Sequence, residues 1–165
     1  MGVVVRAARP GDGEGLARAT RDLAEQYVQL DPERFHDPPI DRAPLIEAEL
    51  EKPLPENQLW LVAEVDGHAV GELQAIAQEP LANAGVQPQR DVGLRRVYVN
   101  YLAVQSAHQG RGIGSLLMDA AEQWAYETGA ELILTDTNVR SPDAVRFYEK
   151  HGFTRQSVIL RKRLA

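Results

Sequence analysis

The chain has 165 residues, 44% of them hydrophobic, which predicts a single domain over residues 1–165 with a substantial core. It has no cysteine, which excludes disulfides and thiolate metal sites, and its formal net charge of −6 argues against a nucleic-acid partner. No apolar run approaches the roughly 20 residues of a membrane span and the N-terminus lacks the pattern of a signal segment, so we predict a cytoplasmic protein with no membrane partner.

The N-terminal part predicts one strand and two helices. A β-branched run over 3–8 predicts the strand. Apolar residues then recur every three or four positions over 13–30, which predicts a helix that Asp12 can cap. The segment 33–39 is a loop rich in side chains able to meet a ligand, or equally a polar connector, and 41–52 predicts a short helix.

A β-hairpin follows. Strands are predicted over 59–65 and 68–76, because the Asp66-Gly67 dipeptide between them suits a tight type I′ turn. The next segment, 79–94, contains prolines and glycines and shows no period, so we expect it to rim a substrate site.

The most strand-like run of the chain is 96–104. Strict alternation would place two sets of side chains on opposite faces. These sets are Val97, Val99, Tyr101 and Ala103, and Tyr98, Asn100, Leu102 and Val104. Both are largely apolar, so we expect a strand that is covered on both sides.

The C-terminal part predicts two helices and two strands. An amphipathic helix is expected over 113–129, and a buried strand over 131–137. The next helix, over 141–152, opens with the capping hydroxyl of Ser141. A last strand is expected over 153–164.

A glycine-rich stretch, 109–114, lies between the strand 96–104 and the helix that begins at Ile113. Its glycines allow the backbone to bend tightly and to approach a ligand closely. The first amides of the helix have no acceptor of their own, and Arg111 adds a positive charge. The stretch therefore predicts a phosphate-binding loop, although glycines before a helix can also serve only a turn.

Two phosphate-binding motifs fit this stretch poorly. A P-loop needs lysine and a hydroxyl residue after its last glycine, whereas Gly114 is followed by Ser115 and Leu116. A dinucleotide fold would place a ribose-binding acid near Asp136, but its glycines follow the strand almost at once, and here 105–109 intervene.

Three segments of the chain carry recognisable motifs, namely Tyr101–Val104, Gln109–Gly114 and Phe147–Phe153. Together they strongly resemble the GNAT superfamily of acyl-CoA-dependent N-acetyltransferases. In that family the glycine stretch reads Gln or Arg, two residues, Gly, one residue, Gly or Ala, which Gln109, Gly112 and Gly114 satisfy. The resemblance is close over about 95–164 and implies an α/β (α+β) fold, with a mixed, strongly twisted sheet flanked by helices.

The resemblance also implies a cofactor site for acetyl-CoA, the acyl-donor cosubstrate, and no metal. Strand backbone would pair with the pantetheine arm, and loop amides would hold the pyrophosphate. Ser141 stands where the family commonly has asparagine, and Asn138 is an alternative for that contact. The implied cofactor-binding residues are Leu102, Ala103, Val104, Gln109, Gly110, Arg111, Gly112, Ile113, Gly114, Ser115, Asn138 and Ser141.

Acetyl transfer to an amine needs a proton donor for the departing thiolate and a neutral nucleophile. The resemblance implies that Tyr148 is the donor, whereas a tyrosine beside Phe147 in a helix could also be a packing residue. The base stays open. Tyr98 stands where some family members carry glutamate, so Glu72, a water molecule or capture of the neutral amine are the alternatives.

We therefore predict an N-acetyltransferase acting on a primary amine. The acceptor, a small molecule or a peptide, is expected between 27–37 and 79–94. The alternatives are a non-catalytic CoA-binding regulator and, less favoured, a dinucleotide-binding oxidoreductase. Whether the chain forms a homodimer stays open.

Overall fold

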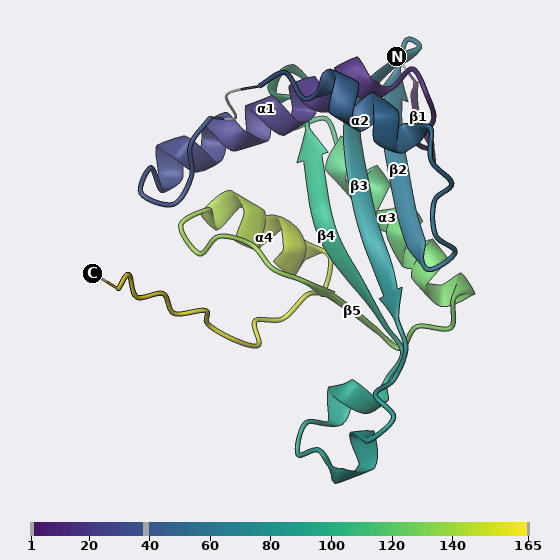
Figure 1. The fold of residues 1–165 in the computed structure, drawn as a ribbon, viewed down its shortest axis with the longest axis vertical. Helices are drawn as coiled ribbons and strands as arrows, with labels where there is room; N and C mark the ends of the chain where they lie inside the picture. The colour runs from purple at the N-terminus through teal and green to yellow at the C-terminus, as the bar shows by residue number, and fades with distance from the viewer. Residues whose placement is uncertain (1, 38–39, 165) are drawn as a thin grey trace.

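A computed structural model describes residues 2–37 and 40–164 and contains one five-stranded sheet (Figure 1). The strands are ordered β1-β2-β3-β4-β5, with antiparallel pairing from β1 to β4 and parallel pairing between β4 and β5. The bounds are β1 Val3–Ala7, β2 Gln58–Val65, β3 His68–Gln78, β4 Arg96–Val104 and β5 Leu132–Thr135. The predicted mixed sheet is confirmed.

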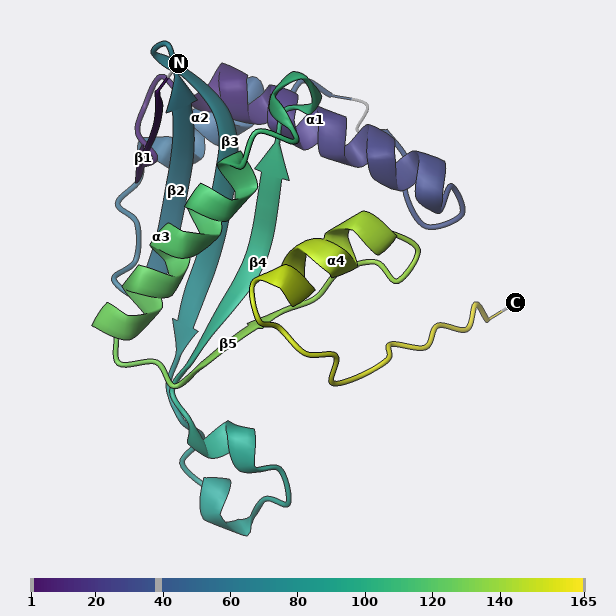
Figure 2. The same cartoon turned by 180° about the vertical axis from the view of Figure 1, so that it is seen from behind.

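Helices cover both faces of this sheet. Figure 1 shows α1 and α2 across the near face, and Figure 2 shows α3 across the opposite face. The fourth helix, α4, lies beside β4 and above β5 in both views. The bounds are α1 Gly13–Leu30, α2 Ala43–Leu50, α3 Ile113–Glu127 and α4 Pro142–Lys150, with short 3₁₀ turns η1 Ala84–Val86, η2 Arg90–Gly93 and η3 Ser106–His108.

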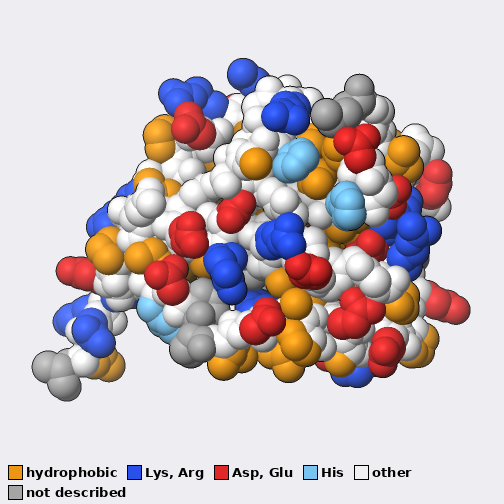
Figure 3. All heavy atoms as spheres, turned by 90° about the horizontal axis from the view of Figure 1, so that it is seen from above, with side chains coloured by type: hydrophobic (Ala, Val, Ile, Leu, Met, Phe, Trp, Pro, Cys, Tyr) orange, Lys and Arg blue, Asp and Glu red, His pale blue; other side chains and the backbone are white. Residues whose placement is uncertain are grey.

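The hydrophobic core has one part on each face. The larger part lies between the sheet and α3, and it includes Leu73, Val97, Leu117 and Met118. The smaller part lies under α1 and α2 and consists of Leu16, Ile46, Val62 and Ala69. On the face seen in Figure 3, acidic and basic side chains are interspersed, so no field of a single sign dominates it.

The predicted β-hairpin is confirmed. Asp66 and Gly67 have φ angles of 50° and 80°, and both therefore adopt the left-handed conformation that a type I′ turn requires. The tight turn fixes the register of β2 against β3, and Glu72 consequently faces Val62.

A β-bulge interrupts β4. Gln74 of β3 lies opposite Tyr101, but the next residue, Ala75, lies opposite Val99, so Asn100 is an extra residue on β4. A bulge of this kind reverses the alternation of side chains beyond it.

The bulge makes the strict alternation expected for β4 wrong. Tyr101 was expected to share a face with Val99, which belongs to the core on the α3 side. Leu102 packs against that core instead. Tyr101 lies on the opposite face, where its hydroxyl donates to Thr20 Oγ1 of α1 at 3.1 Å. Period alone cannot reveal one inserted residue.

Two further expectations are wrong. The segment 79–94 projects beyond the end of the sheet, away from the C-terminal end of α1 (Figures 1 and 2), so it does not form an acceptor site with 27–37. Residues 38–39, the end of the adjoining loop, lie outside the described residues. The segment 153–164 forms no strand, since strand propensity needs a neighbouring strand to pair with.

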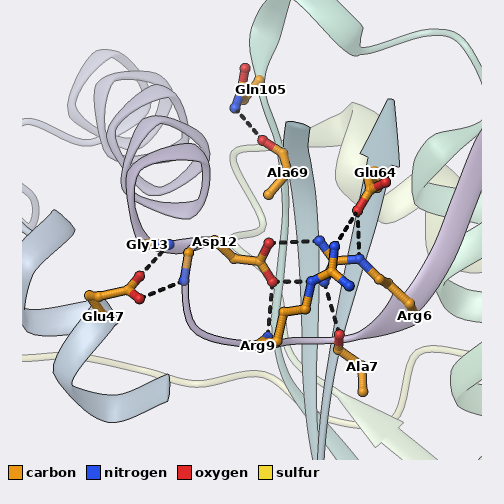
Figure 4. A network of polar contacts seen from close by, with 10 residues as sticks. Arg6, Ala7, Arg9, Asp12, Gly13, Glu47, Glu64, Ala69 and Gln105 are labelled. Carbon is orange, nitrogen blue, oxygen red and sulfur yellow. Dashed lines mark hydrogen bonds and ion pairs between the residues drawn. The ribbon is translucent and has the colours of Figure 1, made fainter. Parts of the chain in front are cut away.

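Asp12 does not cap α1 as expected, because its carboxylate binds arginine instead. Arg6 Nη1 and Nη2 donate to it at 2.8 and 2.7 Å, and the Arg9 amide donates at 2.9 Å (Figure 4). Burial raises the pKa of Asp12, but the hydrogen bonds and charges of Arg6 and Arg9 outweigh that effect and hold it below the usual value. Arg6 also binds Glu64 at 2.6 Å, which links β1, β2 and the turn before α1.

The start of α1 is satisfied by a side chain from α2. Glu47 accepts hydrogen bonds from the amides of Gly11 at 2.5 Å and Gly13 at 3.0 Å (Figure 4). A carboxylate there also interacts favourably with the positive end of the helix dipole. The contact holds α2 against the first turn of α1.

Gly15 lets α1 approach β3 closely. A Cβ atom at this position would lie 2.3 Å from the carbonyl oxygen of Ala69, and Gln105 Nε2 bridges the carbonyls of Gly15 and Ala69 at 2.9 and 3.0 Å. The bridge between Gln105 and Ala69 is visible in Figure 4. The backbones therefore meet with no room for a side chain.

Gly15→Ala should lower the free energy of unfolding. Alanine stabilises a helix interior by about 1 kcal/mol relative to glycine. Overpacking a tight contact costs about 1–3 kcal/mol, and this cost should prevail because the Cβ atom would meet the Ala69 backbone, which cannot move aside as a side chain can. Chemical denaturation would measure the net loss. Gly85→Ala is the control, because nothing lies within 4 Å of its Cβ position. A more stable Gly15→Ala protein would contradict the close approach.

Candidate functional site

The glycine-rich loop has the backbone shape that its sequence predicts. Gly110 and Gly112 have φ angles of 73° and 80°, in the left-handed region that side chains disfavour. Gly112 directly precedes α3. Among the hydrogen bonds of the described residues, none has an amide of 110–115 as its donor, and the first helical bond runs from Leu116 N to Gly112 O. Six consecutive N–H groups thus remain available to an anion.

Neighbouring side chains hold this loop in place. Gln109 Nε2 donates to the carbonyl of Val104 at 2.9 Å. Ser106 donates from its amide and its hydroxyl to Asp22 of α1, at 2.6 and 2.7 Å. The loop is therefore tied to β4 and α1 before α3 begins, whereas Arg111 is exposed and forms no ion pair within the described residues.

The start of α3 packs against α4. A Cβ atom on Gly114 would lie 3.3 Å from the Phe147 ring, so this glycine also serves packing. His151 Nε2 lies 3.0 Å from Ser115 Oγ. The sequence alone assigned no role to His151, although this residue lies within the segment 147–153 that carries the family resemblance.

β4 and β5 separate after a short paired region. Only Arg96–Val99 pair with Leu132–Thr135, and Thr135 Oγ1 donates to the carbonyl of Val99 at 3.0 Å where the pairing ends. Beyond this fork, β4 continues through Leu102, Ala103 and Val104 with no pairing to β5. This edge of β4 can therefore pair with an extended ligand.

Tyr148 of α4 lies at the fork. Its ring packs edge-on against Phe147 and Phe153, with centroids 5.2 and 5.5 Å apart. Burial raises the pKa of Tyr148, and a hydrogen bond with the Thr135 side chain opposes that shift only in part. Although its ring is packed, Tyr148 can still act as a proton donor. Its hydroxyl stays protonated and lies beside the end of the β4–β5 pairing.

Tyr98 is not suited to act as a base. Its hydroxyl donates to the carboxylate of Asp136, just after β5. This hydrogen bond, together with burial, raises the pKa of Tyr98 to about 12. The Tyr98 hydroxyl therefore stays protonated and donates a hydrogen bond, whereas a base would have to accept a proton.

Asn138 and Ser141 shape the loop between β5 and α4. Asn138 Oδ1 accepts from the Arg140 amide at 2.9 Å, while its Nδ2 is buried with no partner among the described residues. The expected cap by the Ser141 hydroxyl is wrong, because that side chain makes no capping hydrogen bond, although its amide donates to the Asn138 carbonyl at 2.9 Å. Arg140 pairs with Asp31 at 3.4 Å, which ties this loop to the end of α1.

A pocket of about 590 Å³ lies between α2 and strands β2 to β4. Asn100 and Tyr101 line it, so it reaches the bulge of β4 next to the fork. Glu72 also lines it but is only 2% exposed. Its Oε2 accepts hydrogen bonds from Trp60 Nε1 at 2.8 Å and Gln74 Nε2 at 3.0 Å.

The pKa of Glu72 is raised above its usual value, mainly because burial disfavours the charged form. Hydrogen bonds from Gln74, Trp60 and Thr20, and the charge of Arg42, offset this only partly. Glu72 was one of three alternatives for the base, and no motif in the sequence indicated that it would face a pocket.

Comparison with known proteins agrees with this geometry. The sequence profile of the acetyltransferase (GNAT) family matches residues 18–153. Acetyltransferase Atu2258 of Agrobacterium fabrum is 41% identical over 59 residues, which cover 36% of this chain and 42% of that protein. Aminoalkylphosphonate N-acetyltransferase of Salmonella typhimurium is 40% identical over 55 residues, or 33% and 36% of the two chains. These matches thus span less than half of either relative.

A crystal structure of a mutant of the BH1408 protein from Bacillus halodurans has a similar fold, with a TM-score of 0.82 and 20% identity. The similarity covers 98% of this chain and 99% of that one. The chain therefore belongs to the acetyltransferase (GNAT) family, and the resemblance noted in its sequence is confirmed. In the part of the chain that the structure describes, no helix is long and apolar enough to cross a membrane, and no group of three or more potential metal ligands occurs.

Glu72→Gln should become increasingly stabilising, relative to the wild type, as pH rises. A carboxyl whose folded pKa is raised contributes stability that is fully present below the unfolded pKa of about 4.3 and is lost as pH rises through the folded value. Thermal unfolding from pH 4 to 9 would measure the difference in Tm. Glu56→Gln, at an exposed position, is the control. A difference independent of pH would contradict the raised pKa.

Proposed function

We propose that this protein is an N-acetyltransferase that transfers the acetyl group of acetyl-CoA to a primary amine. The observation that carries the proposal is the run of amides 110–115, which have no acceptor within the described residues and precede α3. Such a run suits a pyrophosphate, because each N–H can donate to a phosphate oxygen and the helix dipole favours the negative charge. Membership of the family supports acetyl-CoA as the phosphate-bearing cosubstrate.

The proposed cofactor contacts follow the loop and the open edge of β4. The amides of 110–115 would surround the pyrophosphate, and Arg111 would add its charge. The Gln109 amide, which was expected to join them, donates instead to the Ser106 carbonyl at 3.3 Å, so Gln109 would support the loop through its side chain. The backbone of Leu102 to Val104 would pair with the amides of the pantetheine arm, because β5 leaves that edge unpaired. Asn138 supplies a buried Nδ2 without a partner near α4, and Ser141 remains a weaker candidate.

The proposed chemistry is direct attack. The amine nitrogen bonds to the thioester carbonyl carbon, the carbon–sulfur bond breaks, and the sulfur leaves with the bonding electrons. Tyr148 would then donate its proton to the sulfur, and the nitrogen would release one proton that returns through water to the Tyr148 oxygen, so the products are a neutral amide and a free thiol. A phenol is ordinarily a weaker acid than a thiol, but the burial that raises the pKa of Tyr148 would equally disfavour a free thiolate at the same fork.

The direct test is an assay of free thiol release from acetyl-CoA with a panel of amines. The relatives support an amine acceptor, since one is named for N-acetylation of aminoalkylphosphonates. We expect amine-dependent release together with the acetylated amine in mass spectra. CoA binding without transfer to any amine would indicate a CoA-binding regulator, and binding of NAD without CoA would indicate an oxidoreductase.

Gly112→Val should abolish CoA binding without unfolding the protein. Valine would be strained at a φ of 80°, and its side chain would enter the space in front of the amides. Gly129→Val is a matched control, because Gly129 follows the same helix, has a φ of 73° and also has nothing within 4 Å of its Cβ position. Calorimetry should show normal CoA affinity in the control alone. Equal affinity in both variants would make the loop only a turn.

Tyr148→Phe should lower kcat by about 10²-fold to 10⁴-fold, the usual contribution of a positioned proton donor. CoA affinity should change little, and stability should fall by only about 1 kcal/mol, because the ring is kept and one hydrogen bond is lost. Tyr126→Phe, on the exposed side of α3, is the control for steady-state kinetics. A fall of only a few-fold, with chemistry rate-limiting, would assign Tyr148 to packing.

A further inference from the structure

The pocket between α2 and the sheet contains a buried acid that forms no ion pair within the described residues. Glu72 is 2% exposed, accepts hydrogen bonds only from neutral groups, and forms no ion pair within the described residues. A carboxyl in this state is costly to ionise unless a positive group joins it. An ammonium ion that enters the pocket would supply that charge together with N–H donors.

The same pocket is lined by an arginine that has no acidic partner among the described residues. Arg42 precedes α2 and lines the pocket, and its charge lowers the pKa values of both Glu72 and Tyr101. The remaining charged residues of the lining, Lys52 and Glu49, neutralise each other at 2.6 Å. One buried acid and one guanidinium, neither of which forms an ion pair within the described residues, therefore line the same pocket.

The rest of the lining suits a small organic molecule. Apolar side chains such as Leu45, Leu54, Leu59 and Ile76 cover much of it, and about 590 Å³ is within the range of small-molecule sites. The pocket reaches Asn100 and Tyr101, where β4 continues past the fork. An amine bound on Glu72 would therefore lie on the side of β4 opposite α3, near the proposed path of the thioester. Because attack needs the neutral amine, the bound ammonium group would first pass one proton to the Glu72 carboxylate.

We propose that this pocket binds a small zwitterionic amine, with its ammonium group on Glu72 and its carboxylate or other acid group on Arg42. The inference rests on the proposed acetyl transfer and names the class of its acceptor. A guanidinium binds a carboxylate through two parallel N–H donors, which gives direction as well as charge. A dication would instead bring one positive group against Arg42, so a polyamine fits this pocket poorly.

The test compares three charge classes on a common alkyl chain, namely ω-amino acids of three to six carbons, alkylamines of the same lengths, and α,ω-diamines. Binding is followed through the indole N–H resonance of Trp60, which donates to Glu72, with Trp124 as the internal control. We expect the best amino acid to bind about tenfold more tightly than its matched alkylamine, and the diamine to bind most weakly. Diamines that bind as tightly as amino acids would overturn the proposal.

Variants assign the two charges separately. Arg42→Ala should abolish the tenfold preference for amino acids while leaving alkylamine affinity within about twofold. Glu72→Gln should weaken both classes by about tenfold. Arg21→Ala is the matched control, because Arg21 is an exposed arginine on the adjacent α1 that does not line this pocket. A preference that survives Arg42→Ala would overturn the assignment.

The binding readout separates this inference from the proposed function. If the amino acid shifts the Trp60 resonance with the expected preference but no amine is acetylated, the pocket assignment is supported and the proposed activity is wrong. If amines are acetylated with no preference for an acid group and no shift at Trp60, the activity is supported and the zwitterion proposal is overturned.

Discussion

The short pairing between β4 and β5 is the constraint on which the rest of the site depends. Only four residues of each strand pair, and Thr135 closes the last rung by its hydrogen bond to the Val99 carbonyl. The next residue, Asn100, forms the bulge. Tyr148 contacts Thr135, the last residue of β5 that pairs with β4. A longer β5 would occupy the edge of β4 and displace the tyrosine, so the end of this pairing creates both the open edge and the position of the hydroxyl.

The site contains polar groups that have no partner within the described residues. The amides 110–115 have no acceptor there, and Glu72 is a buried acid that forms no ion pair there. A buried acid of this kind lowers the stability of the free protein, and both sets of groups gain partners when ligands bind. Elsewhere, similar groups are fully paired, as in the contacts of Arg6 with Asp12 and of Glu47 with the start of α1. The contrast points to ligand binding rather than to poor packing.

The two sides of the site come from different parts of the chain. The proposed cofactor side uses β4, the glycine-rich loop, α3 and α4, which lie within the segment that carries the family motifs. The pocket on the other side is lined by α1, α2 and strands β2 to β4. Because no motif marks that side, the family predicts the donor chemistry, whereas the acceptor must be argued from the charges and shape of this pocket.

The sequence by itself determined the parts that depend on local physics. Glycines at 110 and 112 fixed a left-handed loop before α3, Asp66-Gly67 fixed the hairpin, and apolar periodicity fixed α1 and α3. Only the tertiary structure decided features that depend on distant partners. The bulge at Asn100 places Tyr101 on the side of α1. Asp12 binds Arg6 instead of capping α1, and 153–164 forms no strand because it pairs with no neighbouring strand. Glu72 lines a pocket because side chains of α2 and β2, which are distant in the sequence, line the same space and Trp60 of β2 donates to its carboxyl group. These long-range contacts leave no pattern in the sequence near Glu72.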